Sequence, residues 1–118
     1  MIKIFLIFIF FSLSSIDDII TSLKSGNSSE IGKYIDTNID IRFGGIKKSY
    51  NKKDAITSLD IFFNNNPIIG FNVIHKGKSQ NGSQYCIGNL ITKNKSFRTT
   101  IFMKQMDNVQ ILQEINFE

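Results

Sequence analysis

The fold class follows from residues 71–117, which read FNVIHKGKSQNGSQYCIGNLITKNKSFRTTIFMKQMDNVQILQEINF. Apolar and polar residues alternate along most of this stretch, as they do in β-strands that bury one face. The dipeptide Asn81-Gly82 is a strong hairpin signal, and Asn94-Lys95 marks a second turn. The stretch is therefore predicted to form four consecutive antiparallel strands.

The pairing of these strands predicts which side chains share a face. Treating Asn81-Gly82 as a two-residue turn places His75 opposite Gly88. In the last hairpin, the register that keeps apolar residues together pairs Met103 with Ile111. The predicted inner face consists of Phe71, Val73, His75, Cys86, Gly88, Leu90, Phe97, Thr99, Ile101, Met103, Ile111, Gln113, Ile115 and Phe117.

Three helices are predicted upstream of these strands. The first is capped by Ser15, and its apolar stripe consists of Ile16, Ile19, Ile20 and Leu23. Asn27 begins a second, short helix, and Asn51 caps a third, which residues 64–67 end with Asn-Asn-Asn-Pro. Between the second and third helices, residues 39–43 alternate as one half-buried strand.

The first 14 residues have the pattern of a signal peptide. A basic start at Lys3 is followed by the apolar run IFLIFIFF over residues 4–11 and by Ser-Leu-Ser-Ser at 12–15, whose small residues are spaced for signal peptidase. The run is too short for a transmembrane helix, which needs about 20 apolar residues, so no stable membrane anchor is expected. A buried first strand is the alternative. We expect cleavage after Ser14, export to the periplasm or beyond, and a single mature domain over 15–118.

Composition and charge indicate a globular domain with a dispersed basic surface. The 118 residues are 42% hydrophobic and 20% charged, which suits one packed domain. The net charge is +4, but the only lysine doublets are 47–48 and 52–53. Proteins that bind nucleic acids concentrate charge on one face, so no nucleic-acid partner is expected. The single cysteine, Cys86, allows no intramolecular disulfide.

Several short stretches match a known family. They are Ser25-Gly26-Asn27, Phe62-Phe63, Asn66-Pro67, His75-Lys76-Gly77, Ser79, Tyr85, Ile87-Gly88, Phe97-Arg98, Phe102-Met103-Lys104 and Gln113-Glu114-Ile115. With them the chain resembles small exported bacterial proteins of unknown function that have a nuclear-transport-factor-two-like (cystatin-like) fold. The resemblance implies an α+β cone, in which two short helices and a third helix pack on a curved antiparallel sheet. It implies no catalytic residues.

Four residues of the predicted inner face are candidates for lining a ligand pocket: His75, Thr99, Gln113 and Cys86. In one interpretation the chain is a non-enzymatic module whose cone holds a small apolar ligand, oriented by His75 and Gln113. In a second, His75 is the general base of an enzyme. In a third, large side chains fill the cone and the protein is an interaction module. The predicted inner face contains no carboxylate, which argues against a carboxylate proton shuttle.

No cofactor or metal is expected. One histidine and one cysteine cannot form a closed tetrahedral zinc site without carboxylates. Gly44-Gly45 lacks the lysine pattern that follows a phosphate-binding glycine loop.

The outer face of the predicted sheet suggests self-association. It carries Ile74, Tyr85, Ile87, Ile91, Phe102 and Leu112. Because the helices cover only one face, we expect this apolar patch to form a two-fold homodimer. Members of the resembling fold often pair through the sheet. The alternatives are a monomer, in which sheet curvature disperses these residues, and a different partner protein.

Overall fold

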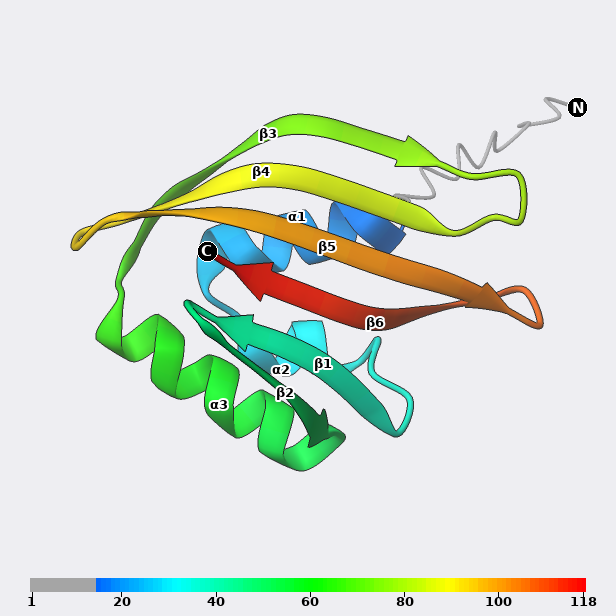
Figure 1. Ribbon diagram of the computed structural model, residues 1–118, viewed down its shortest axis with the longest axis horizontal. Helices are drawn as coiled ribbons and strands as arrows, with labels where there is room; N and C mark the ends of the chain where they lie inside the picture. Colours follow the sequence, from blue (N-terminus) through cyan, green and yellow to red (C-terminus); the bar gives the residue numbers. More distant parts are fainter. Residues whose placement is uncertain (1–14) are drawn as a thin grey trace, which may run out of the picture.

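The computed structural model describes residues 15–118, so the predicted signal peptide lies outside the described residues. The elements, in chain order, are α1 (Ser15–Ser25), α2 (Ser28–Gly32), β1 (Asn38–Phe43), β2 (Ile46–Asn51), α3 (Lys52–Asn65), β3 (Ile68–Lys78), β4 (Gln84–Thr92), β5 (Ser96–Met106) and β6 (Val109–Phe117) (Figure 1). Within this range no helix is long and apolar enough to cross a membrane.

The three helices begin and end close to where the sequence predicts. The side-chain oxygen of Asn27 accepts the N–H of Glu30 at 3.1 Å, and that of Asn51 accepts the N–H of Asp54 at 2.8 Å. Each bond satisfies a donor that the first helical turn leaves free. α3 ends at Asn65, two residues before the only proline.

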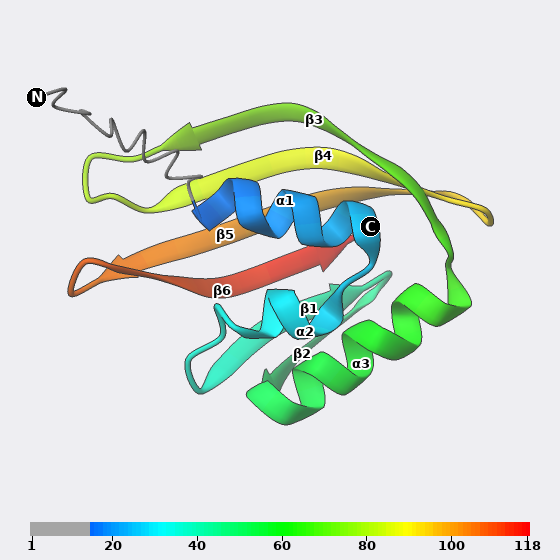
Figure 2. The same cartoon turned by 180° about the vertical axis from the view of Figure 1, so that it is seen from behind.

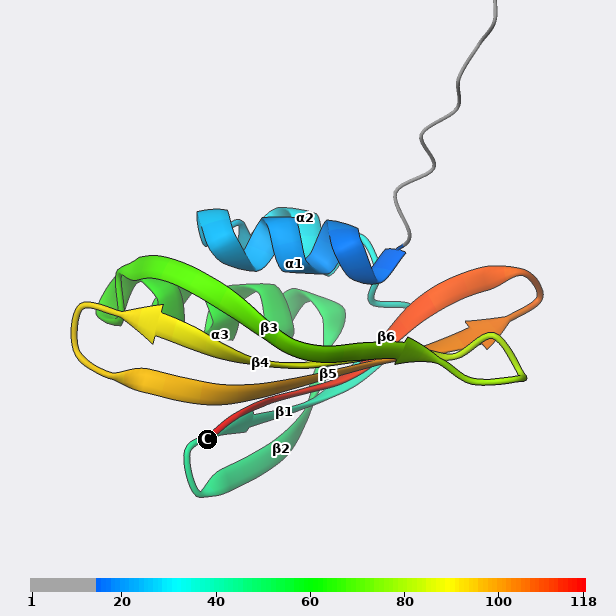
Figure 3. The same ribbon diagram turned by 90° about the horizontal axis from the view of Figure 1, so that it is seen from above.

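The strands form one sheet in the order β2-β1-β6-β5-β4-β3. All pairs are antiparallel except β1 with β6, which is parallel. The sheet is curved, and α1 and α2 lie over one of its faces (Figures 2 and 3). Figure 1 looks onto the other face, with α1 behind the strands. The predicted α+β architecture of helices on a curved sheet is confirmed.

One strand was not predicted. Gly44-Gly45 does not end the β-structure but turns the chain back, so that β2 pairs with β1 along its whole length. Gly44 has a φ of +63°, a conformation that glycine adopts without strain. The parallel pairing then joins this hairpin to β6, which extends the sheet beyond the four predicted strands.

The core lies between the helices and the inner face of the sheet. It is made of aliphatic residues from α1 and β1 and of a cluster of phenylalanines around Phe117, whose side chain is 0% exposed. The ring centroid of Phe117 lies 4.6 Å from that of Phe62, 5.8 Å from that of Phe43 and 6.4 Å from that of Phe63. These rings join α3 to β1 and β6.

The predicted register of the first long hairpin is wrong by one residue between the loop and His75, and by two residues beyond an irregularity at Val73–His75, where Val73 pairs with Gly88. Ser79 donates its backbone N–H to the carbonyl of Ser83 at 2.8 Å, so the connection is a longer loop and Lys78 pairs with Gln84. His75 therefore lies opposite Ile87 rather than Gly88. Because strand side chains alternate between faces, this shift turns His75 to the outer face.

The β4–β5 register keeps the predicted side chains on the inner face, whereas the β5–β6 register exchanges two of them between the faces. The β4–β5 pairing differs from the prediction by two residues, so the predicted inner positions on these strands, including Cys86 and Thr99, remain inside. In the β5–β6 hairpin an irregularity near Phe102 pairs Met103 with Leu112. Leu112 is therefore buried on the inner face, and the prediction that it faces outward is wrong. Ile111, predicted to face inward, pairs with exposed Lys104 instead.

Candidate functional site

The four predicted pocket residues do not meet at one site. Cys86 and Thr99 are completely buried on the inner face of β4 and β5. Gln113 is half-buried beside the irregularity of β6, and His75 is exposed on β3. The placement of His75 inside the cone is wrong, so an enzyme with His75 as general base in that cone has no structural basis here.

Both buried candidates are accounted for by packing. The hydroxyl of Thr99 donates to the carbonyl of Phe97 at 3.0 Å, which satisfies it locally. Burial raises the pKa of the Cys86 thiol to about 11, although the nearby Lys76 ammonium opposes that rise. A thiol with so high a pKa is a poor nucleophile at neutral pH, so Cys86 behaves as a small apolar core residue.

His75 belongs to a polar pair on the outer face. Its Nε2 lies 2.6 Å from the hydroxyl oxygen of Tyr85, and the two groups share a hydrogen bond. Gly77 stands directly opposite Tyr85 in the ladder, and a Cβ there would lie 2.6 Å from the tyrosine oxygen. The glycine thus lets the tyrosine ring lean across β3 towards His75.

Two aspartates of α1 attach this helix to the rest of the fold. Asp17 accepts a hydrogen bond from the Nζ of Lys76 at 2.7 Å, and this contact raises the pKa of Lys76. Asp18 accepts from the hydroxyl of Tyr34. Burial, and after it the bond to Asp18, raises the pKa of Tyr34 to about 12. Neither contact could be predicted from the sequence, because the partners Lys76 and Tyr34 are distant from these acids in the chain.

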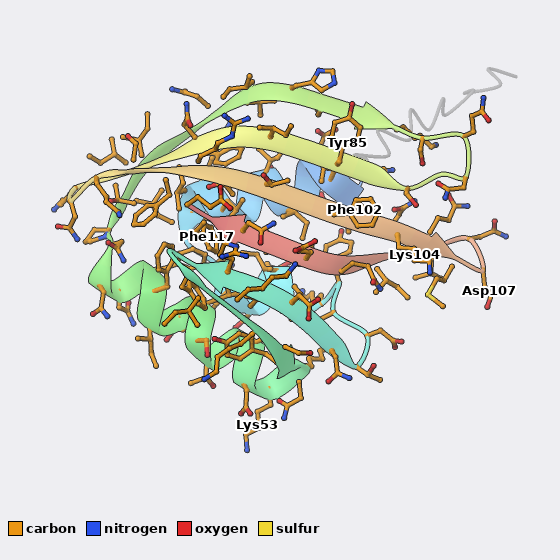
Figure 4. All side chains as sticks on the ribbon, in the orientation of Figure 1. Lys53, Tyr85, Phe102, Lys104, Asp107 and Phe117 are labelled. Carbon is orange, nitrogen blue, oxygen red and sulfur yellow. The ribbon has the colours of Figure 1, made fainter. Side chains whose placement is uncertain are left out.

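The outer face of the sheet carries an apolar cluster, which we define as Ile74, Tyr85, Ile87, Ile91 and Phe102. Tyr85 pairs with Phe102 across β4 and β5, and Figure 4 shows these two side chains on neighbouring strands. Ile74 is 61% exposed and Phe102 is 40% exposed. The cluster is the predicted patch without Leu112.

Residues 15–118 contain no group of three or more His, Cys, Asp or Glu side chains placed to hold a metal ion.

Comparison with known proteins identifies the family. The family model for DUF4783, a domain of unknown function, matches residues 16–118. The chain belongs to the DUF4783 family. A DUF4783 protein from Bacteroides ovatus is 34% identical, with a TM-score of 0.79 and with 85% of this chain and 90% of that one covered. One from Bacteroides uniformis is 30% identical, with a TM-score of 0.82 and coverage of 86% and 94%.

More distant structures support the fold of this DUF4783 domain. An NTF2-like protein of unknown function from Cytophaga hutchinsonii has a TM-score of 0.62 at 9% identity, over 87% of this chain and 84% of that one. No curated protein matches the sequence. The predicted resemblance to bacterial proteins of unknown function with a nuclear-transport-factor-two-like fold is confirmed.

Proposed function

We propose that this DUF4783 protein is an exported, non-enzymatic interaction module that works as a homodimer through the outer face of its sheet. The observation that carries the proposal is the apolar cluster on β3, β4 and β5, where Tyr85 and Phe102 stand side by side. Large apolar side chains that remain exposed on adjacent strands are typical of protein interfaces.

The filled interior supports an interaction module over a ligand carrier. Phe117, Leu90, Ile101 and Met103 are all 0% exposed, and the phenylalanine rings of α3 pack against that of Phe117. A small-molecule site needs a concave pocket that can enclose most of its ligand. Full burial of these side chains in the part of the fold where the sequence suggested a ligand therefore supports the interaction module.

The polar atoms within the cluster suit burial in an interface. The Tyr85 hydroxyl already has a hydrogen-bond partner in His75, so a second copy can cover the ring while that hydroxyl stays hydrogen-bonded. The surrounding charges on β5 are basic, namely Arg98 and Lys104, and both are exposed. Two-fold symmetry brings like charges near each other, so we expect a weak dimer that salt strengthens.

Sedimentation equilibrium tests the dimer. At micromolar concentration the protein should sediment as a monomer–dimer equilibrium. Phe102→Lys should shift it to monomer, because the interface loses an apolar ring and would have to desolvate a charge in its place. Met106→Lys is the matched control, because Met106 is 45% exposed on the same strand but outside the cluster. A wild-type protein that stays monomeric at all concentrations, or a Phe102→Lys dimer of unchanged affinity, would contradict the proposal.

Export has a separate test. The apolar run over residues 4–11 and the small residues after it support cleavage after Ser14. N-terminal sequencing of the protein from the periplasm or medium should begin at Ser15. A protein that retains Met1 in those fractions would contradict cleavage, and a protein found only in the cytoplasm would contradict export.

A further inference from the structure

A groove runs between the edge strand β2 and helix α3. It consists of two adjoining hollows that share Tyr50 and Ser58 in their walls. One hollow is apolar and the other is polar and bordered by lysines. β2 and β3 are the two ends of the sheet, so this groove is far along the strand order from the outer-face cluster on β3, β4 and β5.

The apolar hollow is the size of one large side chain. It has a volume of about 230 Å³ and is lined by Phe43, Tyr50, Ser58, Ile61 and Phe62. Ile61 is 55% exposed, so the hollow is open to solvent. Since an apolar cavity of about 150 Å³ accommodates benzene, this hollow has room for an aromatic or branched aliphatic side chain.

The polar hollow has exposed lysines at its border. Its volume is about 420 Å³, and its walls include Lys48, Asp54 and Thr57. Lys52 and Lys53 follow in the first turn of α3, where both are exposed (Figure 4 labels Lys53). Within the walls the charges of Lys48 and Asp54 balance, so the positive excess lies at the border, where Lys52 and Lys53 follow the wall residue Asn51; Lys52 also lines a separate hollow with Asp36. This excess at the border favours a ligand that bears carboxylates.

The backbone beside the groove can accept a further strand. Among the described residues 15–118, β2 is the end of the sheet and pairs only with β1, over Ile46–Asn51. An edge strand presents alternate N–H and C=O groups to solvent, and these can form a ladder with an extended peptide. Docking by strand addition draws affinity from the backbone bonds and specificity from pockets for alternate side chains.

We propose that this groove binds an extended acidic peptide segment of a partner protein, which adds to β2 as a seventh strand. One aromatic or branched aliphatic side chain of the segment enters the hollow beside Ile61. A neighbouring glutamate or aspartate side chain meets Lys48 and the lysines at the start of α3. A second copy of this chain fits less well, because its own β2 edge would bring the same lysines together.

Selection from a library of random short peptides on the immobilised domain tests the proposal. We expect enriched sequences that combine one aromatic or branched aliphatic residue with acidic residues close to it. The affinity of a selected peptide should fall about tenfold or more in Ile61→Glu and in the double variant Lys48→Glu, Lys52→Glu. Methylation of alternate backbone nitrogens in the peptide should abolish binding, and methylation of the intervening ones should not.

Matched controls keep the test specific. Ile69→Glu changes an isoleucine that is 66% exposed on β3, at the other end of the sheet, and should leave affinity unchanged. Circular dichroism shows whether each variant is folded. The proposal is overturned if no peptide is enriched, or if the enriched peptides bind the groove variants as well as they bind the wild type. Two other results would also overturn it. Binding of decanoate that is lost in Ile61→Glu would indicate an acyl chain in the groove, and self-association that is lost in Ile61→Glu would indicate a second copy of this chain.

Discussion

Replacing Phe117 by alanine removes the ring on which the core phenylalanines converge. The side chain is 0% exposed and its centroid lies within 4.6–6.4 Å of those of Phe43, Phe62 and Phe63. Truncating a buried phenylalanine to alanine destabilises a protein by about 3–5 kcal/mol, because transfer energy is lost and a cavity remains. With three ring partners we expect the upper part of this range, about 4–5 kcal/mol.

Urea unfolding followed by far-UV circular dichroism measures this loss. Since a domain of this size has a total stability of about 5–15 kcal/mol, Phe117→Ala should remove a large part of it. The melting temperature should fall by about 15–30 °C. Ile46→Ala, at a side chain that is 68% exposed, is the control and should change stability by less than about 0.5 kcal/mol.

A small effect of Phe117→Ala would refute the reasoning. Exchanges that conserve volume in a core usually cost less than about 1.5 kcal/mol of stability. If Phe117→Ala cost no more than this, the ring would not be tightly packed. The cone would then have spare volume, and the interpretation as a ligand pocket would regain support.

Three further predictions concern single groups. The pKa of Tyr34 is raised from 10.0 to about 12, so the stability that it contributes is complete below pH 10 and is lost as the pH rises towards 12. The free energy of unfolding in urea should therefore fall less steeply over that interval in Tyr34→Phe than in the wild type, and parallel curves would contradict this. The Cys86 thiol should react with a disulfide reagent at neutral pH only after unfolding, because it is buried with a pKa of about 11; rapid reaction of the native protein would refute its burial. Asn51→Ala should lower the free energy of unfolding in urea by about 1 kcal/mol, because the N–H of Asp54 loses the side-chain oxygen to which it donates. An unchanged free energy would mean that water replaces this hydrogen bond fully.

Local chemistry made the helices predictable from the sequence. Asn27 and Asn51 cap helices with their own side chains, and Pro67 cannot continue one. These signals act over three or four residues, so they do not depend on the rest of the fold. The alternation within β4 and β5 likewise identified Cys86 and Thr99 as inner residues, because a register difference of two preserves the face.

Which side chains of β3 and β6 face inward depends on a loop length and on strand irregularities that the sequence pattern does not predict. Asn81-Gly82 resembles a two-residue turn, but the side chain of Asn81 accepts the N–H of Ser83 and the loop runs from Ser79 to Ser83. One additional residue of slip was enough to move His75 from the cone to the surface. The irregularity in β6 exchanged Ile111 and Leu112 in the same way.

The candidate site was less predictable than the fold for a related reason. The contacts of Asp17 with Lys76 and of His75 with Tyr85 join elements whose relative placement follows only from the tertiary structure. The groove beside β2 was missed because β2 itself was missed, and its residues Ile46–Asn51 have two adjacent lysines where a strand pattern alternates.

Native mass spectrometry of the protein purified from the cells and medium of its native source distinguishes a homodimeric interaction module from a ligand carrier most directly. A homodimer with a solid interior predicts ions of two identical chains that begin at Ser15, with no additional mass, alongside monomer at lower concentration. A monomer that retains the mass of a small molecule through gentle desolvation, at every protein concentration, would contradict both the filled cone and the pairing of the outer faces.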